Sequence, residues 1–75
     1  MNGKYFDMWL GIGLNILHYR KERGLTQMQL AEKCNVSKNH IQRIETAAAG
    51  CSVEVLSDIA ASLQIPLKKL FEFRE

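Results

Sequence analysis

Large apolar residues recur along this chain at intervals of three and four positions, which is the period of an α-helix with one buried face. Ile12, Ile16 and Tyr19 show this spacing before Gly24, where a first helix is predicted to stop. The same pattern predicts five helices, at about residues 9–23, 26–34, 38–46, 53–64 and 66–71. No stretch shows a convincing strand pattern, so the predicted fold class is all-α with five helices.

The segment that joins the second and third predicted helices has the composition of a tight turn. Thr26 and Gln29 form the T-x-x-Q pattern of a capping box at the start of the second helix. Asn35 tolerates the left-handed backbone conformation that ends a helix abruptly, and Ser37 can cap the helix that follows. Two short helices joined in this way form a helix-turn-helix, here predicted over residues 26–46.

The third predicted helix separates apolar from polar residues around its axis. An advance of about 100° per residue turns Ile41 and Ile44 inward. The outward and flanking positions carry hydrogen-bonding side chains: Lys38, Asn39, His40, Gln42, Arg43 and Thr46. The second helix of a helix-turn-helix protrudes and fits the major groove of DNA, which is about 12 Å wide. We therefore expect this face to read DNA rather than only to keep the helix soluble.

Length and charge are consistent with one small domain that meets an anionic partner. The 75 residues, 47% of them hydrophobic, are interpreted as a single domain over 1–75, with an N-terminal extension at 1–8 and a C-terminal helix and tail at 66–75. The net charge is only +2, but residues 9–46 hold six Lys and Arg against three Glu. This mild excess lies in the half that carries the helix-turn-helix and fits an anionic partner such as nucleic acid, but an ordinary solvated face would carry a similar charge.

Sequence motifs for catalysis, metal binding and membrane insertion are not found. The two cysteines, Cys34 and Cys51, lack the spacing of a zinc site and are expected to be reduced thiols in a cytoplasmic protein. No nucleophile–His–acid set, carboxylate pair or phosphate-binding glycine loop indicates an enzyme or a cofactor, and no small-molecule ligand is expected. The apolar run at residues 8–17 is far shorter than the roughly 20 residues that span a bilayer, so no membrane segment or export signal is predicted.

The stretch RKERGLTQMQLAEKCNVSKNHIQRIE resembles the phage-repressor and Cro type of helix-turn-helix, often called Xre-like. GLTQ, LAEK, VS and IxRIE occur in this order at the spacing of that family, and the resemblance covers about residues 12–71. It implies a five-helix, lambda-repressor-like domain that binds double-stranded operator DNA, usually as a two-fold dimer. The expected function is therefore transcriptional regulation at a near-palindromic operator.

The resemblance also implies roles for individual residues. Gln27 matches a glutamine that contacts a phosphate and braces the first base-reading residue, while Arg20 and Glu45 match a buried structural ion pair. The expected DNA-binding set is Gln27, Ser37, Lys38, Asn39, His40, Gln42 and Arg43. Of these, His40 is expected to pack beside the core or to touch a phosphate. Lys and Arg suit guanine, and Asn and Gln suit adenine.

The chain departs from the family pattern after its third helix. Where the family has a glycine and basic residues, this chain has Ala47, Ala48 and Ala49, and Leu17 replaces a frequent arginine. We expect fewer phosphate contacts, weaker binding and a third helix that continues for one further turn, because alanine favours helix.

Two other functions remain open on the same scaffold. The chain could be an antitoxin that binds a toxin protein, or a protein-interaction module that has lost DNA binding, which the alanine-rich loop at 46–51 favours. A homodimer is expected for this chain, through the fourth and fifth predicted helices. An apolar cluster near the N-terminus is expected to contribute to it: Tyr5, Phe6, Met8 and Trp9.

Overall fold

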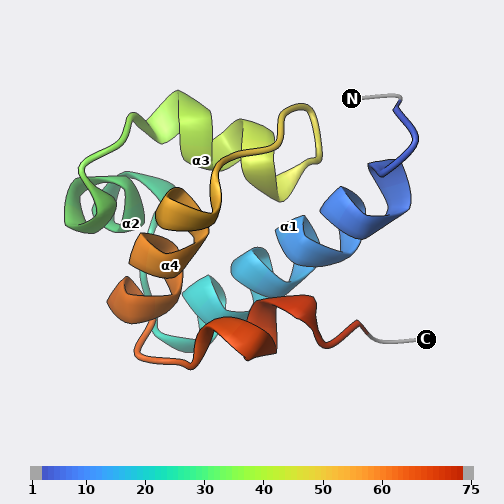
Figure 1. Cartoon of the computed structure of the whole chain (residues 1–75). Coiled ribbons are helices and arrows are strands. Elements are labelled where there is room, and N and C mark those ends of the chain that lie inside the picture. Colours follow the sequence, from blue (N-terminus) through green and yellow to red (C-terminus); the bar gives the residue numbers. More distant parts are fainter. Residues whose placement is uncertain (1–2, 74–75) are drawn as a thin grey trace.

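The computed structural model describes residues 3–73 and consists of helices packed around one core (Figure 1). The elements in order are α1 (Phe6–Glu22), α2 (Gln27–Cys34), α3 (Lys38–Glu45), α4 (Val53–Ser62) and the 3-10 helix η1 (Leu67–Phe71). Within residues 3–73 there is no strand, so the all-α prediction is confirmed. The expected fifth α-helix is instead a short 3-10 helix that follows Pro66, whose carbonyl accepts a hydrogen bond from Lys69 N at 3.0 Å.

The long helix α1 supports the other elements. It begins at Phe6, three residues before the predicted start, and the glycines at 11 and 13 do not interrupt it. Ile12 and Ile16 are fully buried in the core, and α1 packs against α3 and η1. Gly13 permits the close approach of α3, because a β-carbon at this position would lie 2.5 Å from the Ile44 carbonyl oxygen.

The helix-turn-helix is formed as the sequence predicts. The Thr26 hydroxyl accepts from Gln29 N at 3.0 Å while the Gln29 side chain accepts from Thr26 N at 2.9 Å, which completes the capping box. Asn35 ends α2 in the left-handed conformation with φ of 57°, and the Ser37 hydroxyl accepts from His40 N at the start of α3. The angle between α2 and α3 is thus set by side-chain caps as well as by the core.

The predicted extension of the third helix into the alanines is wrong. α3 ends at Glu45, and Ala47 takes a left-handed conformation with φ of 59° while its side chain is fully buried. The amides of Ala48 and Ala49 both donate to the Arg43 carbonyl, at 2.8 and 3.2 Å, and fold the loop back over the helix end. The hydrogen bonds of this turn and the burial of Ala47 outweigh the preference of alanine for helix.

Helix α4 and the segment before α1 differ from the prediction in detail. Ser52 caps α4 as expected, and the inward residues Leu56, Ile59, Ala60 and Leu63 are buried. Val53 is 63% exposed rather than inward, because it lies in the first turn of α4, where no neighbouring element covers it. Met8 and Trp9 pack against the core, whereas Tyr5 is exposed. Among residues 3–73, no helix is long and apolar enough to cross a membrane.

Candidate nucleic-acid interface

The outward face of α3 carries the side chains expected to read DNA. Lys38, Asn39, Gln42 and Arg43 are exposed, whereas Ile41 and Ile44 on the opposite face are buried. The face belongs to a helix that is capped at its first turn and held by the core. These four side chains are therefore presented to solvent from a rigid support.

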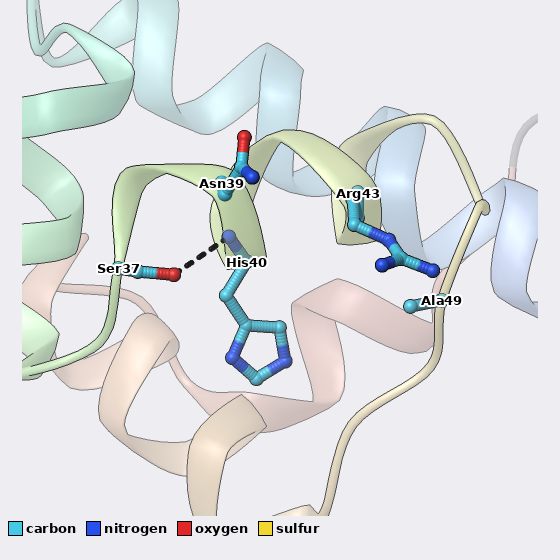
Figure 2. A pocket seen from close by; sticks show the side chains of 5 residues that line it. All are labelled: Ser37, Asn39, His40, Arg43 and Ala49. Carbon is cyan, nitrogen blue, oxygen red and sulfur yellow. Dashed lines mark hydrogen bonds between the residues drawn. The ribbon is translucent and has the colours of Figure 1, made fainter.

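An open hollow of about 390 Å³ lies beside this face, between the start of α3 and the loop that follows it. Its lining residues come from both segments: Ser37, Asn39, His40, Arg43 and Ala49 (Figure 2). Figure 2 shows Asn39 and His40 pointing to opposite sides of α3, while the Arg43 guanidinium extends toward Ala49. The half-buried His40 is thus turned away from Asn39, and Arg43 lies at the edge of the alanine loop.

The loop after α3 brings no basic side chain to this hollow. Ala48 is exposed and Ala49 is half-buried, and Thr46 donates its hydroxyl hydrogen bond to the Gln42 carbonyl at 3.0 Å. The loop therefore presents small apolar side chains and backbone groups at its surface in place of the cations that are typical of the resembled family.

Beneath the face, a buried ion pair joins α1 to α3. Arg20 Nε donates to Glu45 Oε2 at 2.6 Å and Arg20 Nη2 donates to Glu45 Oε1 at 3.1 Å, a bidentate geometry. The two side chains are only 9% and 3% exposed. Arg20 Nη1 also donates to the Leu25 carbonyl at 2.9 Å, which fixes the chain just before α2. One guanidinium thus determines how α1, the start of α2 and the end of α3 lie together.

Gln27 extends this network to the first turn of α2. Its Nε2 donates to Glu45 Oε1 at 3.0 Å, and the side chain is half-buried. The amide therefore contacts the ion pair in this structure. Its position at the N-terminus of α2, where backbone N–H groups favour anions, is still suited to a phosphate.

One polar residue that the sequence analysis did not single out organises the other side of α1. Asn15 is buried, and its Nδ2 donates to the carbonyls of Leu70 at 2.9 Å and Glu72 at 3.2 Å. Its place between Ile12 and Ile16, on the inward face of the helix, was the available signal. Asn15 therefore holds the C-terminal segment against α1.

The cysteines are not placed for metal binding or catalysis. Cys34 is buried with its Sγ 3.4 Å from Ser62 Oγ, and burial raises the pKa of its thiol. Burial also raises the pKa of the Cys51 thiol, to about 11. Both thiols are thus protonated at neutral pH and weakly nucleophilic. Among the residues that the structure describes, no group of three His, Cys, Asp or Glu could hold a metal ion.

Comparison with known proteins agrees with this geometry. A family model described as helix-turn-helix matches residues 16–70. The immunity repressor protein of Bacillus phage phi105 is 39% identical over 59 residues, which is 79% of this chain and 41% of that protein. The chain thus spans about two fifths of the length of this relative.

Two solved structures show the same arrangement of helices. The structure of SinR, a master regulator for biofilm formation, in complex with DNA superposes with a TM-score of 0.77 at 34% identity, covering 81% of this chain and 98% of that one. The restriction-modification controller protein C.AhdI from Aeromonas hydrophila has a TM-score of 0.82 at 22% identity, covering 84% and 96%. With a family match over most of its length, the chain belongs to the Xre-like helix-turn-helix family.

Proposed function

We propose that this chain is a sequence-specific DNA-binding transcriptional regulator that acts in the cytoplasm and places α3 in the major groove. The observation that carries the proposal is the exposed face of α3, with Lys38, Asn39, Gln42 and Arg43 held by a capped and buried scaffold. The membership of the chain in a helix-turn-helix family, and a relative of 34% identity solved with DNA, support it.

Each polar residue has a role that its chemistry suits. Lys38 and Arg43 would donate to guanine O6 and N7, and Asn39 and Gln42 would pair with adenine N6 and N7. Ser37 and Gln27 lie at the N-termini of α3 and α2, where backbone N–H groups favour phosphate oxygens. His40 points to the other side of α3 from Asn39 (Figure 2), and we assign it a backbone contact rather than a base contact.

Two copies would bind a near-palindromic operator, with their α3 helices in successive major grooves about 34 Å apart. Because the loop after α3 carries alanines, few phosphates would be neutralised by each copy. Each phosphate contact contributes about −0.9 to the slope of log K against log salt concentration, so the salt dependence of binding should be shallow for this class. Specificity would then depend mainly on the α3 face.

The test is selection of bound sites from a random duplex library at low salt, followed by titration of the selected site against salt. Enrichment of a two-fold-symmetric sequence, with an affinity that falls as salt rises, is the expected result. If the folded chain enriches no sequence at all, the proposed function is wrong.

A protein-interaction module on the same scaffold is the second candidate, and the alanine loop favours it. Ala48 is exposed in the loop where the resembled family carries basic residues that contact DNA phosphates. If the chain binds selected and scrambled duplexes equally weakly, this candidate replaces the first, and a search for a partner protein should follow.

A further inference from the structure

One face of α1 remains uncovered although it carries large apolar side chains. Leu10 is 36% exposed and Leu14 is 54% exposed, and Leu17 on the same side is half-buried. Positions 10, 14 and 17 are spaced by four and three residues, so these leucines form one continuous line along the helix. We call Leu10, Leu14 and Leu17 the α1 seam. Contiguous apolar surface of this kind marks an interaction site on small proteins.

The two ends of the seam carry opposite charges. Asp7 lies seven residues before Leu14 and Lys21 lies seven residues after it, and both side chains are exposed. At a rise of 1.5 Å per residue, Asp7 and Lys21 are about 21 Å apart along α1 and cannot pair with each other. A second α1 running antiparallel, with Leu14 opposite Leu14, would place Asp7 of each copy beside Lys21 of the other. The charge pattern is thus complementary to its own reversed copy.

We propose that a second copy of this chain docks antiparallel along the α1 seam, with the two-fold axis at Leu14. The inference rests on the proposed function, for which the second copy would supply the second DNA-binding α3 helix. The outward residues of α4 form no comparable apolar line, since Val53 is the only large apolar residue exposed on this helix and Glu54, Ser57 and Asp58 after it are polar and exposed. This interface therefore differs from the fourth and fifth helices expected from the sequence.

The orientation of the other elements around α1 would place both α3 helices on the same face of this dimer. Gly13 and Asn15 lie about 100° to either side of Leu14 around the helix. α3 packs over Gly13 and η1 is bonded to Asn15, so these elements lie on the two sides of the seam, and Figure 1 shows them on opposite sides of α1. The two-fold axis of an antiparallel pair of α1 helices passes midway between the two helices. It is perpendicular to the two helix axes and to the line that joins one helix to the other. Rotation about it keeps both α3 helices on one side of the dimer and both η1 helices on the other.

Phe73 widens the apolar surface at the edge of the seam. Its ring lies over Gly11, where a β-carbon would come within 2.6 Å of Phe73 Cδ1, and the ring is 47% exposed. Gly11, Leu14, Asn15 and Phe73 line a hollow of about 280 Å³ beside the seam. A leucine side chain from the second copy fits the size and apolar character of this hollow.

The experiment is sedimentation velocity of the whole chain over a concentration series, without DNA. We expect the wild type to associate in the micromolar range, as a small interface would. Leu14→Lys should abolish this association, because it places two like charges together at the axis. Asp7→Lys and Lys21→Asp should each weaken it by about tenfold, since each brings like charges into contact.

The double variant Asp7→Lys with Lys21→Asp is the decisive measurement. In the antiparallel arrangement, position 7 of one copy lies beside position 21 of the other, so the double variant again places opposite charges together. We therefore expect its dissociation constant to return to within about threefold of wild type. Met28→Lys, at a 52% exposed apolar position on α2, is the matched control and should associate normally. Circular dichroism on every variant shows that each is folded at the temperature used.

Three results would overturn the proposal: a monomeric wild type throughout the series, normal association of Leu14→Lys, or a double variant as weak as the single ones. The proposed function is tested separately, because a folded seam variant at high concentration should still bind a single half-site through α3. If the chain dimerises through Leu14 but selects no DNA sequence, the dimer stands and the proposed function fails.

Discussion

The inner side of α3 is buried and hydrogen-bonded to other helices, whereas its outer side is exposed to solvent. On the inner side, Glu45 accepts three hydrogen bonds from Arg20 and Gln27 and is almost fully buried. On the outer side, Asn39 and Arg43 are exposed on a helix whose position the inner side determines. The inner side should therefore control stability and the outer side should control binding. The difference can be measured, because substitutions on the two sides should affect separate properties.

The largest expected effect comes from Glu45→Ala. Removing the carboxylate leaves the Arg20 guanidinium buried without its partner, which should cost about 3–5 kcal/mol of unfolding free energy. The measurement is the thermal or urea unfolding transition. Replacing both partners, as in Arg20→Met with Glu45→Leu, should recover much of the loss. A Glu45→Ala protein that melts like wild type would show that the pair does not support the fold.

The two glycines of α1 allow a second comparison within the inner region. Gly13→Ala should cost about 1–3 kcal/mol or more, because the new methyl group meets the backbone oxygens of Ile44 and Glu45 at 2.5 and 2.7 Å. Gly11→Ala meets only the Phe73 ring, at 2.6 Å, and the half-exposed ring can move. Urea unfolding of both variants should therefore show a clearly smaller loss for Gly11→Ala, and equal losses would contradict this account.

On the outer side, Asn39→Ala and Arg43→Ala should leave the unfolding free energy within about 0.5 kcal/mol of wild type. Their free energy of binding to the selected operator should become less favourable by about 1–3 kcal/mol for each lost base contact. Fluorescence anisotropy with labelled duplex measures the affinity, and a scrambled duplex serves as the control. Normal operator binding by both variants would exclude the α3 face as the reading surface.

The smallest expected effect is a gain of binding at the alanine loop. Ala48 is exposed, so Ala48→Lys can add a phosphate contact without disturbing the core. The slope of log K against log salt should become steeper by about 0.9, while sequence preference stays unchanged. Ala48→Glu is the matched control and should weaken binding to DNA. An unchanged salt slope for Ala48→Lys would mean that this loop does not face the DNA.

Local sequence signals predicted the helix-turn-helix well and the loop after it poorly. The capping box at Thr26, the left-handed Asn35 and the cap at Ser37 act within a few residues, so their chemistry can be recognised in the sequence. Ala47 could not be predicted in this way. Its left-handed conformation depends on burial against elements that are distant in sequence, and alanine alone favours the opposite outcome.

The candidate site was predictable in its composition but not in its connections. Ile41 and Ile44 set the helical phase, and this placed Asn39, Gln42 and Arg43 outward. The bond from Gln27 to Glu45 and the role of Asn15 depend on how separate helices meet. Val53 shows the same limit, since a helical pattern does not say whether a neighbour covers the first turn.

The hydrogen bond from Asn15 to the Leu70 carbonyl has a consequence for folding kinetics. It joins residues 55 positions apart, whereas α2 and α3 follow each other in the chain and no contact between them joins residues more than 18 positions apart. Because the entropy of closing a loop rises with its length, we expect the helix-turn-helix to form early and the union of α1 with η1 to form late. During synthesis, α1 would then remain partly uncovered until Leu70 had left the ribosome. Helix α3 would then be formed and packed on α2 before α1 and η1 had come together.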